Sequence, residues 1–180
     1  MRTFIAIDLP DQLRQSLDKL RRCLQRSSIR VSWVKAENLH ITLKLLGEID
    51  TDLLPDLICA LDRTAVNSSP FTARIQGSGF FPNRCRPRIL YAATDAIELF
   101  RQLTSSLNQE LTPFGFKLER NFNPHITLAR IKSERNIEQL FAELDQHTLQ
   151  GRFEVKGLSL YRSILHPTGV RYQQLHHSPF

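Results

Sequence analysis

The chain has 180 residues, 41% of them apolar and 23% charged, with a formal net charge of +6. This composition is typical of a globular protein and excludes collagen-like, coiled-coil and mostly disordered chains. No apolar run approaches the ~20 residues that cross a bilayer, and the opening MRTFIAIDLP lacks a signal-peptide cleavage site. Three widely spaced cysteines favour a reducing compartment over a disulfide framework. We therefore expect a cytoplasmic protein without a membrane segment.

Apolar periodicity predicts strands and helices in alternation along the whole chain. Strands are expected at 3–8, 30–35, 39–46, 71–76, 89–93, 116–118, 125–130, 153–161 and 170–176. Helices are expected at 11–26, 52–66, 96–111 and 136–144, with a Gly/Pro/Arg-rich loop at 77–88 and a turn at 166–169. No linker or low-complexity segment interrupts this pattern, so we expect one domain over residues 1–180.

One segment of the sequence occurs twice. LHITLKL at 39–45 reappears as PHITLAR at 124–130, an offset of 85 residues, and each copy has an Asn two positions before its His. Each half of the chain carries strands and two helices around its copy. The repeat therefore predicts an α+β protein with two pseudo-symmetric lobes that face each other.

The repeated strings place the same polar groups on one face of a strand. Side chains at i and i+2 share a face, so His40 projects with Thr42, and His125 with Thr127. If the two strands are adjacent, two imidazoles and two hydroxyls meet in one cleft. One ring can act as a base on an attacking oxygen and the other as an acid on the leaving oxygen, while the hydroxyls stabilise charge on a phosphate. The residues alone do not tell acid from base.

Other residues are weaker candidates. Lys44 shares the face of His40 by alternation and could bind phosphate, or could be a solvated lysine. Arg130 points away from His125 by strict alternation, so it reaches the cleft only if the strand twists or bulges. The loop with Arg84, Arg86 and Arg88 and the nearby Phe80 and Phe81 could contact a polyanion. No carboxylates stand at metal-ligand spacing from the two histidines, so we expect no metal site.

Several strings resemble the 2H phosphoesterase superfamily, and within it the RNA 2′,3′-cyclic phosphodiesterases, formerly named 2′-5′ RNA ligases. They are FIAIDLP, WVKAENLHITLKLLGEI, RPRILY, NPHITLAR and LYRSIL, and they cover nearly the whole chain. The resemblance implies a bilobal fold with two antiparallel sheets, flanked by helices, around a central cleft.

The resemblance also implies an activity: hydrolysis of terminal 2′,3′-cyclic phosphates on RNA to 2′-phosphomonoesters, without metal or cofactor, with 2′-5′ ligation as the reverse activity. It implies that His40 protonates the departing 3′-oxygen and that His125 accepts a proton from water. Thr42 and Thr127 would hold phosphate oxygens, assisted by Arg130. The expected partner is RNA with a cyclic phosphate end, fragments of tRNA among the candidates, and the expected state is a monomer.

Two alternatives stay open at this point. The first is a related phosphodiesterase that acts on a small cyclic nucleotide or a 2′-5′ oligonucleotide. The second is a non-catalytic RNA-binding module in which the two motifs only hold phosphate. Two imidazoles at acid and base positions argue against the second, because Arg or Lys would serve binding alone better.

Overall fold

The computed structural model of the protein describes residues 1–25, 30–118, 122–167 and 169–180. The strands within these ranges are β1 Arg2–Asp8, β2 Val31–Trp33, β3 His40–Glu48, β4 Phe71–Phe81, β5 Ile89–Thr94, β6 His125–Ile131, β7 Gln150–Val155, β8 Gly157–His166 and β9 Gly169–Pro179. The α-helices are α1 Asp11–Leu24, α2 Leu54–Val66, α3 Ile97–Leu111 and α4 Ile137–Asp145. Single 3₁₀ turns occur at Ala36–Asn38, Thr51–Leu53 and Thr112–Phe114. The expected α+β class is confirmed.

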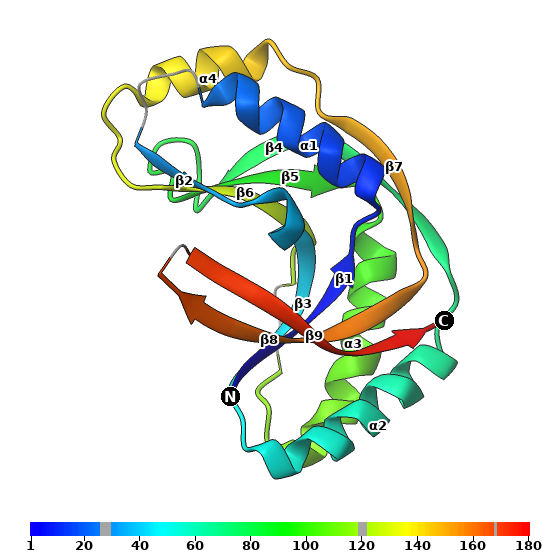
Figure 1. The fold of residues 1–180 in the computed structure, drawn as a ribbon. Coiled ribbons are helices and arrows are strands. Elements are labelled where there is room, and N and C mark those ends of the chain that lie inside the picture. The colour runs from blue at the N-terminus through cyan, green and yellow to red at the C-terminus, as the bar shows by residue number, and fades with distance from the viewer. Residues whose placement is uncertain (26–29, 119–121, 168) are drawn as a thin grey trace.

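All the described strands belong to one curled antiparallel sheet (Figure 1). Its order is β7-β4-β5-β6-β3-β1-β8-β9, with β2 paired to β6. The join between β6 and β3 is a single residue pair, Ile41 with Ile126. The two sheets expected from the sequence are therefore two halves of one sheet, which we call the β6 half (β7, β4, β5, β6, β2) and the β3 half (β3, β1, β8, β9).

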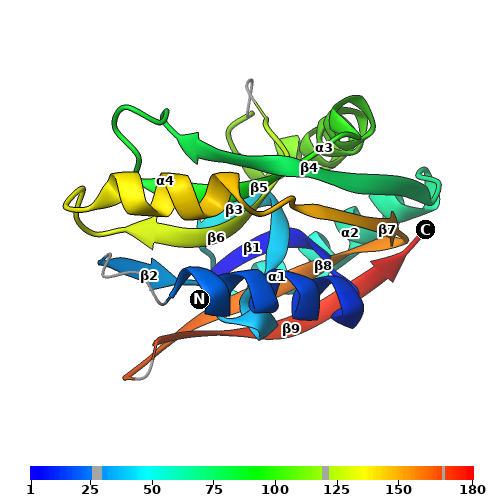
Figure 2. The same cartoon turned by 90° about the horizontal axis from the view of Figure 1, so that it is seen from above.

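The helices cover one face of this sheet. Helix α2 packs against α3 and against β8 and β9, whereas α1 packs against α4 and β7 (Figures 1 and 2). Leu13, Leu17 and Leu24 form the buried stripe of α1 at helical spacing. Strand β1 thus lies in the β3 half while the following helix packs on the β6 half, so the chain crosses between the halves.

Apart from shifts of one to three residues at the ends of other strands, the observed strands differ from the expected ones at three places. Strand β4 continues to Phe81, because its pairing with β5 reaches Phe81 opposite Ile89. Residues 116–118 form no strand, although their apolar content suggested one. The expected strand 153–161 is two strands separated at Lys156, because β7 pairs with β4 while β8 pairs with β1.

Two expected elements extend into residues outside the described ranges. The first helix was expected to reach residue 26, and the described helix ends at Leu24. The expected turn 166–169 includes Thr168, which lies outside the described residues. Among the described residues, no helix is both long and apolar enough to span a membrane.

Substitutions at the join between the halves test this architecture. Ile41 and Ile126 are both fully buried. We expect Ile41→Ala and Ile126→Ala each to lower the free energy of unfolding by about 2–5 kcal/mol, because each leaves a cavity in a packed core. Leu45 on the same strand is 66% exposed, so Leu45→Ala should change it by about 0.5 kcal/mol or less. Urea unfolding of the three variants gives the comparison, and equal losses at Leu45 and Ile41 would contradict it.

Candidate active site

The β3–β6 join brings the two repeated motifs together. In an antiparallel register with Ile41 opposite Ile126, the residues on either side of that pair project from the other face of the sheet. Those residues are His40 and Thr42 on β3 and His125 and Thr127 on β6. The four polar side chains therefore emerge around one point, on the face opposite the helices. We call this the inner face.

Both imidazoles are held by the same kind of hydrogen bond. The Nδ1 of His40 donates to the backbone carbonyl of Asn38 at 2.8 Å, and the Nδ1 of His125 donates to that of Asn123 at 2.7 Å. A carbonyl only accepts, so the proton of each neutral ring sits on Nδ1 and Nε2 keeps its lone pair. The Nε2 of His40 lies 2.9 Å from the Thr42 hydroxyl. Each ring thus presents Nε2 for proton transfer.

Each motif strand contains a β-bulge directly after its His-x-Thr segment. On β3, Ala6 pairs with Thr42 and Ile5 with Lys44, so Leu43 is the extra residue. On β6, Tyr91 pairs with Thr127 and Leu90 with Ala129, so Leu128 is the extra residue. An extra residue reverses the alternation of faces beyond it. Side chains directly after the bulge are therefore on the face opposite to the one that strict alternation predicts; on β3 this holds through Leu45, because a second extra residue, Leu46, restores the alternation.

The bulges exchange the expected positions of two cationic residues. Arg130 pairs with Ile89, two residues from Tyr91, and so shares the inner face with His125 and Thr127. Lys44 is 3% exposed and its ammonium donates to the carbonyl of Lys117. The structure therefore brings Arg130 to the site and does not bring Lys44 there, contrary to the expectation that Lys44 shares the face of His40.

Aromatic rings surround both histidines. Phe4 and Tyr172 lie 4.9 and 5.3 Å from the His40 ring, and Phe81 and Tyr91 lie 4.8 and 5.5 Å from the His125 ring, between ring centroids. A Cβ on Gly79 would come within 2.5 Å of the Tyr91 ring, so glycine is needed at the strand position that this ring crosses. These rings fix both imidazoles in place and bury part of their surface.

A carboxylate lies beside His40 on the neighbouring strand. Asp8 pairs with His40 across β1 and β3, and accepts hydrogen bonds from the hydroxyls of Ser159 (2.6 Å) and Tyr161. The Nδ1 of His177 lies 2.8 Å from the Ser159 oxygen and 3.8 Å from Asp8. Burial, together with donation to Asp8, raises the pKa of Tyr161 far above its usual value, so Tyr161 stays a donor.

The pKa of His40 lies below its usual value, as the balance of influences that act in opposite directions. Burial lowers its pKa, because a charged ring loses hydration. The Asn38 carbonyl and the negative charge of Asp8 raise it, whereas the positive charges of His125 and Arg14 lower it further. The positive charge of Arg130 likewise acts on Tyr172, whose pKa is raised mainly by burial. The inner face therefore combines two imidazole rings with the Arg130 cation, which suits a phosphate.

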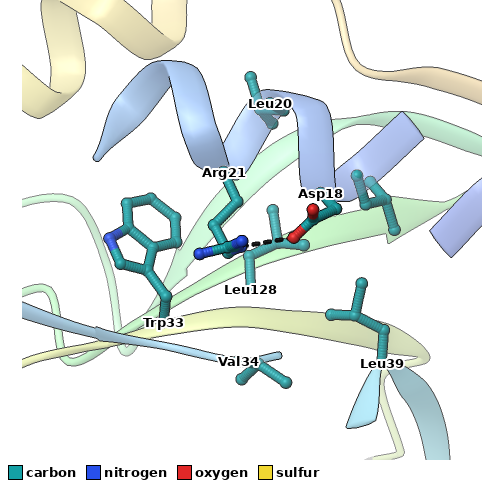
Figure 3. Close-up of a pocket in the computed structure, with 8 residues that line it drawn as sticks. Asp18, Leu20, Arg21, Trp33, Val34, Leu39 and Leu128 are labelled. Atoms are coloured by element: carbon teal, nitrogen blue, oxygen red, sulfur yellow. Dashed lines mark hydrogen bonds and ion pairs between the residues drawn. The ribbon is translucent and has the colours of Figure 1, made fainter. Parts of the chain in front are cut away.

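On the other face of the motif strands is a small apolar pocket between α1 and the sheet (Figure 3). Leu39 and Leu128 line it together with Trp33, Val34, Leu17 and Leu20, and the Asp18–Arg21 ion pair lies at its edge. Its volume of about 10 Å³ has room for one water molecule at most. The pocket is a packing gap and not a substrate site. The apolar side chains around it hold Leu39 and Leu128, which are the neighbours of His40 and Thr127 in the sequence.

The basic loop expected to bind a polyanion is largely committed to internal contacts. The two terminal guanidinium nitrogens of Arg84 donate to the carboxylate of Asp145. The guanidinium carbon of Arg84 lies 4.4 Å from the Phe141 ring centroid. Arg88 lies 4.0 Å from Glu134. Phe80 is buried in the core, whereas its neighbour Phe81 contacts His125.

The adjacent His176 and His177 point to opposite faces of β9. His176 lies 2.8 Å from Asp62 of α2, which holds the end of β9 on that helix, while His177 lies on the inner face. All three cysteines are free and exposed. Among the described residues, no group of three or more His, Cys, Asp or Glu side chains is arranged to hold a metal ion.

Comparison of the sequence with known protein families identifies the family of this chain. The family model of the 2′-5′ RNA ligase superfamily matches residues 9–166. The chain belongs to this superfamily. It is 34% identical to the "RNA 2′,3′-cyclic phosphodiesterase" of Methanothermobacter thermautotrophicus over 97% of this chain and 96% of that protein.

Solved structures of other proteins share the fold. A Thermus thermophilus protein superposes with a TM-score of 0.82 at 30% identity, covering 99% of this chain and 97% of that one. Escherichia coli LigT complexed with 3′-AMP superposes with a TM-score of 0.79 at 27% identity, with the same coverage of 99% and 97%.

Sequence reasoning missed the Asp8 network and the aromatic residues around the histidines. Asp8, Ser159 and His177 are far apart in the chain and meet only through the pairing of β1, β8 and β9. One signal was present: the chain has three tyrosines, and all of them lie on the inner face.

The bulge on β6 leads to a prediction about anion binding. We expect Arg130→Ala to weaken the binding of inorganic phosphate about tenfold, because it removes a charged donor from the inner face. Lys44→Met should leave the dissociation constant unchanged in folded protein, and Arg101→Ala on α3 controls for the loss of one positive charge. Titration calorimetry measures all three. Equal weakening by Arg130→Ala and Arg101→Ala would contradict the placement of Arg130 at the site.

Proposed function

We propose that this protein hydrolyses 2′,3′-cyclic phosphate ends of RNA to 2′-phosphomonoesters by general acid and base catalysis with two histidines. The observation that carries the proposal is the emergence of His40 and His125, each with Nε2 available, on either side of the Ile41–Ile126 pair. Membership of the 2′-5′ RNA ligase superfamily and the names of the relatives support the reaction class.

The proposed reaction uses one ring on each side of the phosphorus. The Nε2 of neutral His125 takes a proton from water, and the hydroxide oxygen forms a bond to phosphorus. The bond from phosphorus to the 3′-oxygen breaks, and protonated His40 gives its Nε2 proton to that oxygen. The products are a 2′-phosphomonoester and a free 3′-hydroxyl, and each transfer contributes about 10²–10⁴ in rate.

The remaining polar groups of the inner face stabilise charge on the phosphate. We assign the hydroxyls of Thr42 and Thr127 to the non-bridging oxygens, where donors become stronger as negative charge develops. The Arg130 guanidinium adds a cation on the same face. A 5′-hydroxyl in place of water would give a 2′-5′ phosphodiester through the same proton transfers.

The substrate is proposed to be RNA with a cyclic phosphate end. The partly exposed rings of Tyr172, beside His40, and of Phe81 and Tyr91, beside His125, offer apolar faces on which bases can stack. That the chain acts as a cytoplasmic monomer, with one domain over residues 1–180, stays a prediction.

The direct test is ³¹P NMR of a short RNA with a 2′,3′-cyclic phosphate end, incubated with the protein in excess EDTA. We expect the cyclic phosphate signal to be replaced by that of a 2′-monophosphate, because the proposed proton transfers use imidazoles alone. A 3′-monophosphate product would contradict the assignment of the leaving oxygen, and loss of turnover in EDTA would contradict the metal-free mechanism.

Variants of the two rings complete this test. His40→Ala and His125→Ala should each reduce the rate by about 10²–10⁴ while the circular dichroism spectrum is unchanged. His147→Ala serves as the matched control, because His147 follows α4 and is exposed. Either variant of the pair turning over at the wild-type rate would overturn the two-histidine mechanism.

A further inference from the structure

The two halves of the site are equivalent in their motifs and different in the residue beside each histidine. On β1, the residue paired with His40 is Asp8, whereas on β5 the residue paired with His125 is Ala93. Directly paired side chains lie about 4.5–5.5 Å apart at their Cβ atoms and on the same face. A carboxylate therefore lies beside one catalytic ring, and a methyl group lies at the corresponding position beside the other.

The surroundings of His40 make this carboxylate important. Burial among aromatic rings disfavours a charged imidazole, as do the nearby positive charges of His125 and Arg14. A ring that must donate a proton has to hold one before the reaction begins. Charged and titratable groups face His40 or its carboxylate neighbour from every surrounding element: Asp8 from β1, Arg14 from α1, His125 from β6, Tyr161 from β8, and Tyr172 and His177 from β9. Asp8 supplies the negative charge among them.

Asp8 is held in place by an ordered set of donors. Its two oxygens accept from the hydroxyls of Tyr161 and Ser159, and Ser159 is fully buried. The amide of Gln174 donates to the Ser159 oxygen at 2.9 Å, and His177 lies 2.8 Å from the same oxygen. Hydroxyls donating to a carboxylate stabilise its charged form. The network thus fixes a negative charge at one position beside His40, without a direct hydrogen bond to the ring.

We propose that Asp8 is a positioning residue for proton transfer: its negative charge favours the protonated form of His40 against the burial of that ring, whereas the equivalent position beside His125 is occupied by Ala93, which offers no charge. This inference rests on the proposed function for its catalytic consequence. Its physical content is the charge preference of one ring, which can be measured without a substrate.

The sign of the effect follows from the roles of the rings. The rate should fall at high pH when the acid His40 loses its proton, and at low pH when the base His125 gains one. Removing the charge of Asp8 lowers the pKa of His40, so the high-pH limb of the profile moves to lower pH. The size of this shift measures the coupling between the Asp8 charge and the His40 ring. The low-pH limb should stay in place, because the charge that is removed lies beside His40 and not beside His125.

Asp8→Asn tests this, because the amide keeps the size of the side chain and an oxygen that accepts from Tyr161. We expect activity to fall severalfold above the wild-type high-pH limb, because less of His40 is protonated there, and to be nearly normal at the low-pH limb. A merely structural role would lower the rate equally at every pH. A uniform loss would therefore overturn the proposal.

Ala93→Asp is the mirror variant. It places a carboxylate beside His125, where Ala93 is only half-buried, and should move the low-pH limb to higher pH with the high-pH limb unchanged. If Asp8→Asn fails to fold, this second variant still tests whether a carboxylate paired with a catalytic histidine shifts the pH profile. No movement of the low-pH limb would show that a carboxylate at this ladder position does not control the adjacent ring.

The readout without substrate separates the two proposals. Histidine ¹⁵N NMR titrations of the wild type and Asp8→Asn should show the His40 midpoint lower in the variant and the His125 midpoint unchanged. An unchanged His40 midpoint overturns the role of Asp8 even if cyclic phosphates are hydrolysed. A lowered His40 midpoint in a protein that leaves cyclic phosphates intact supports the role of Asp8 and refutes the proposed function.

Discussion

The single pair between Ile41 and Ile126 is the contact on which the site depends. It joins two half-sheets that are otherwise built from separate strands, and its antiparallel register decides which residues stand beside the join. Because both isoleucines are fully buried on the helix-covered face, the polar residues on either side of them must project from the other face. The same contact therefore completes the core and assembles the four catalytic candidates.

The bulges at Leu43 and Leu128 then decide which other side chains reach the inner face. Beyond the bulge, β6 offers Arg130, while the corresponding residue of β3 is Leu45. One side of the site thus carries an extra cation and the other, through Asp8, an extra anion. A scaffold built from a repeat needs such differences, because an acid and a base are different functions and two identical surroundings would not separate them.

Much of this architecture could be predicted from the sequence. The HITL repeat identified both histidines and both threonines, because strand alternation is local and apolar Ile and Leu mark the buried face. Strict alternation failed after the bulges, so Lys44 was expected on the wrong face. Arg130 reaches the site because β6 contains a bulge, which was the condition stated for it from the sequence. Asp8 could not be predicted, since its partners Ser159 and Tyr161 are more than 150 residues away and meet it only through strand pairing.

The assignment of acid and base is the central claim, and a change of leaving atom tests it most directly. In an RNA whose cyclic phosphate carries sulfur in place of the 3′-oxygen, the departing thiolate needs no proton. Single-turnover hydrolysis by His40→Ala should then recover to within about tenfold of the wild type, while His125→Ala stays slower by about 10²–10⁴. Recovery of His125→Ala in place of His40→Ala, or recovery of neither, would contradict the account.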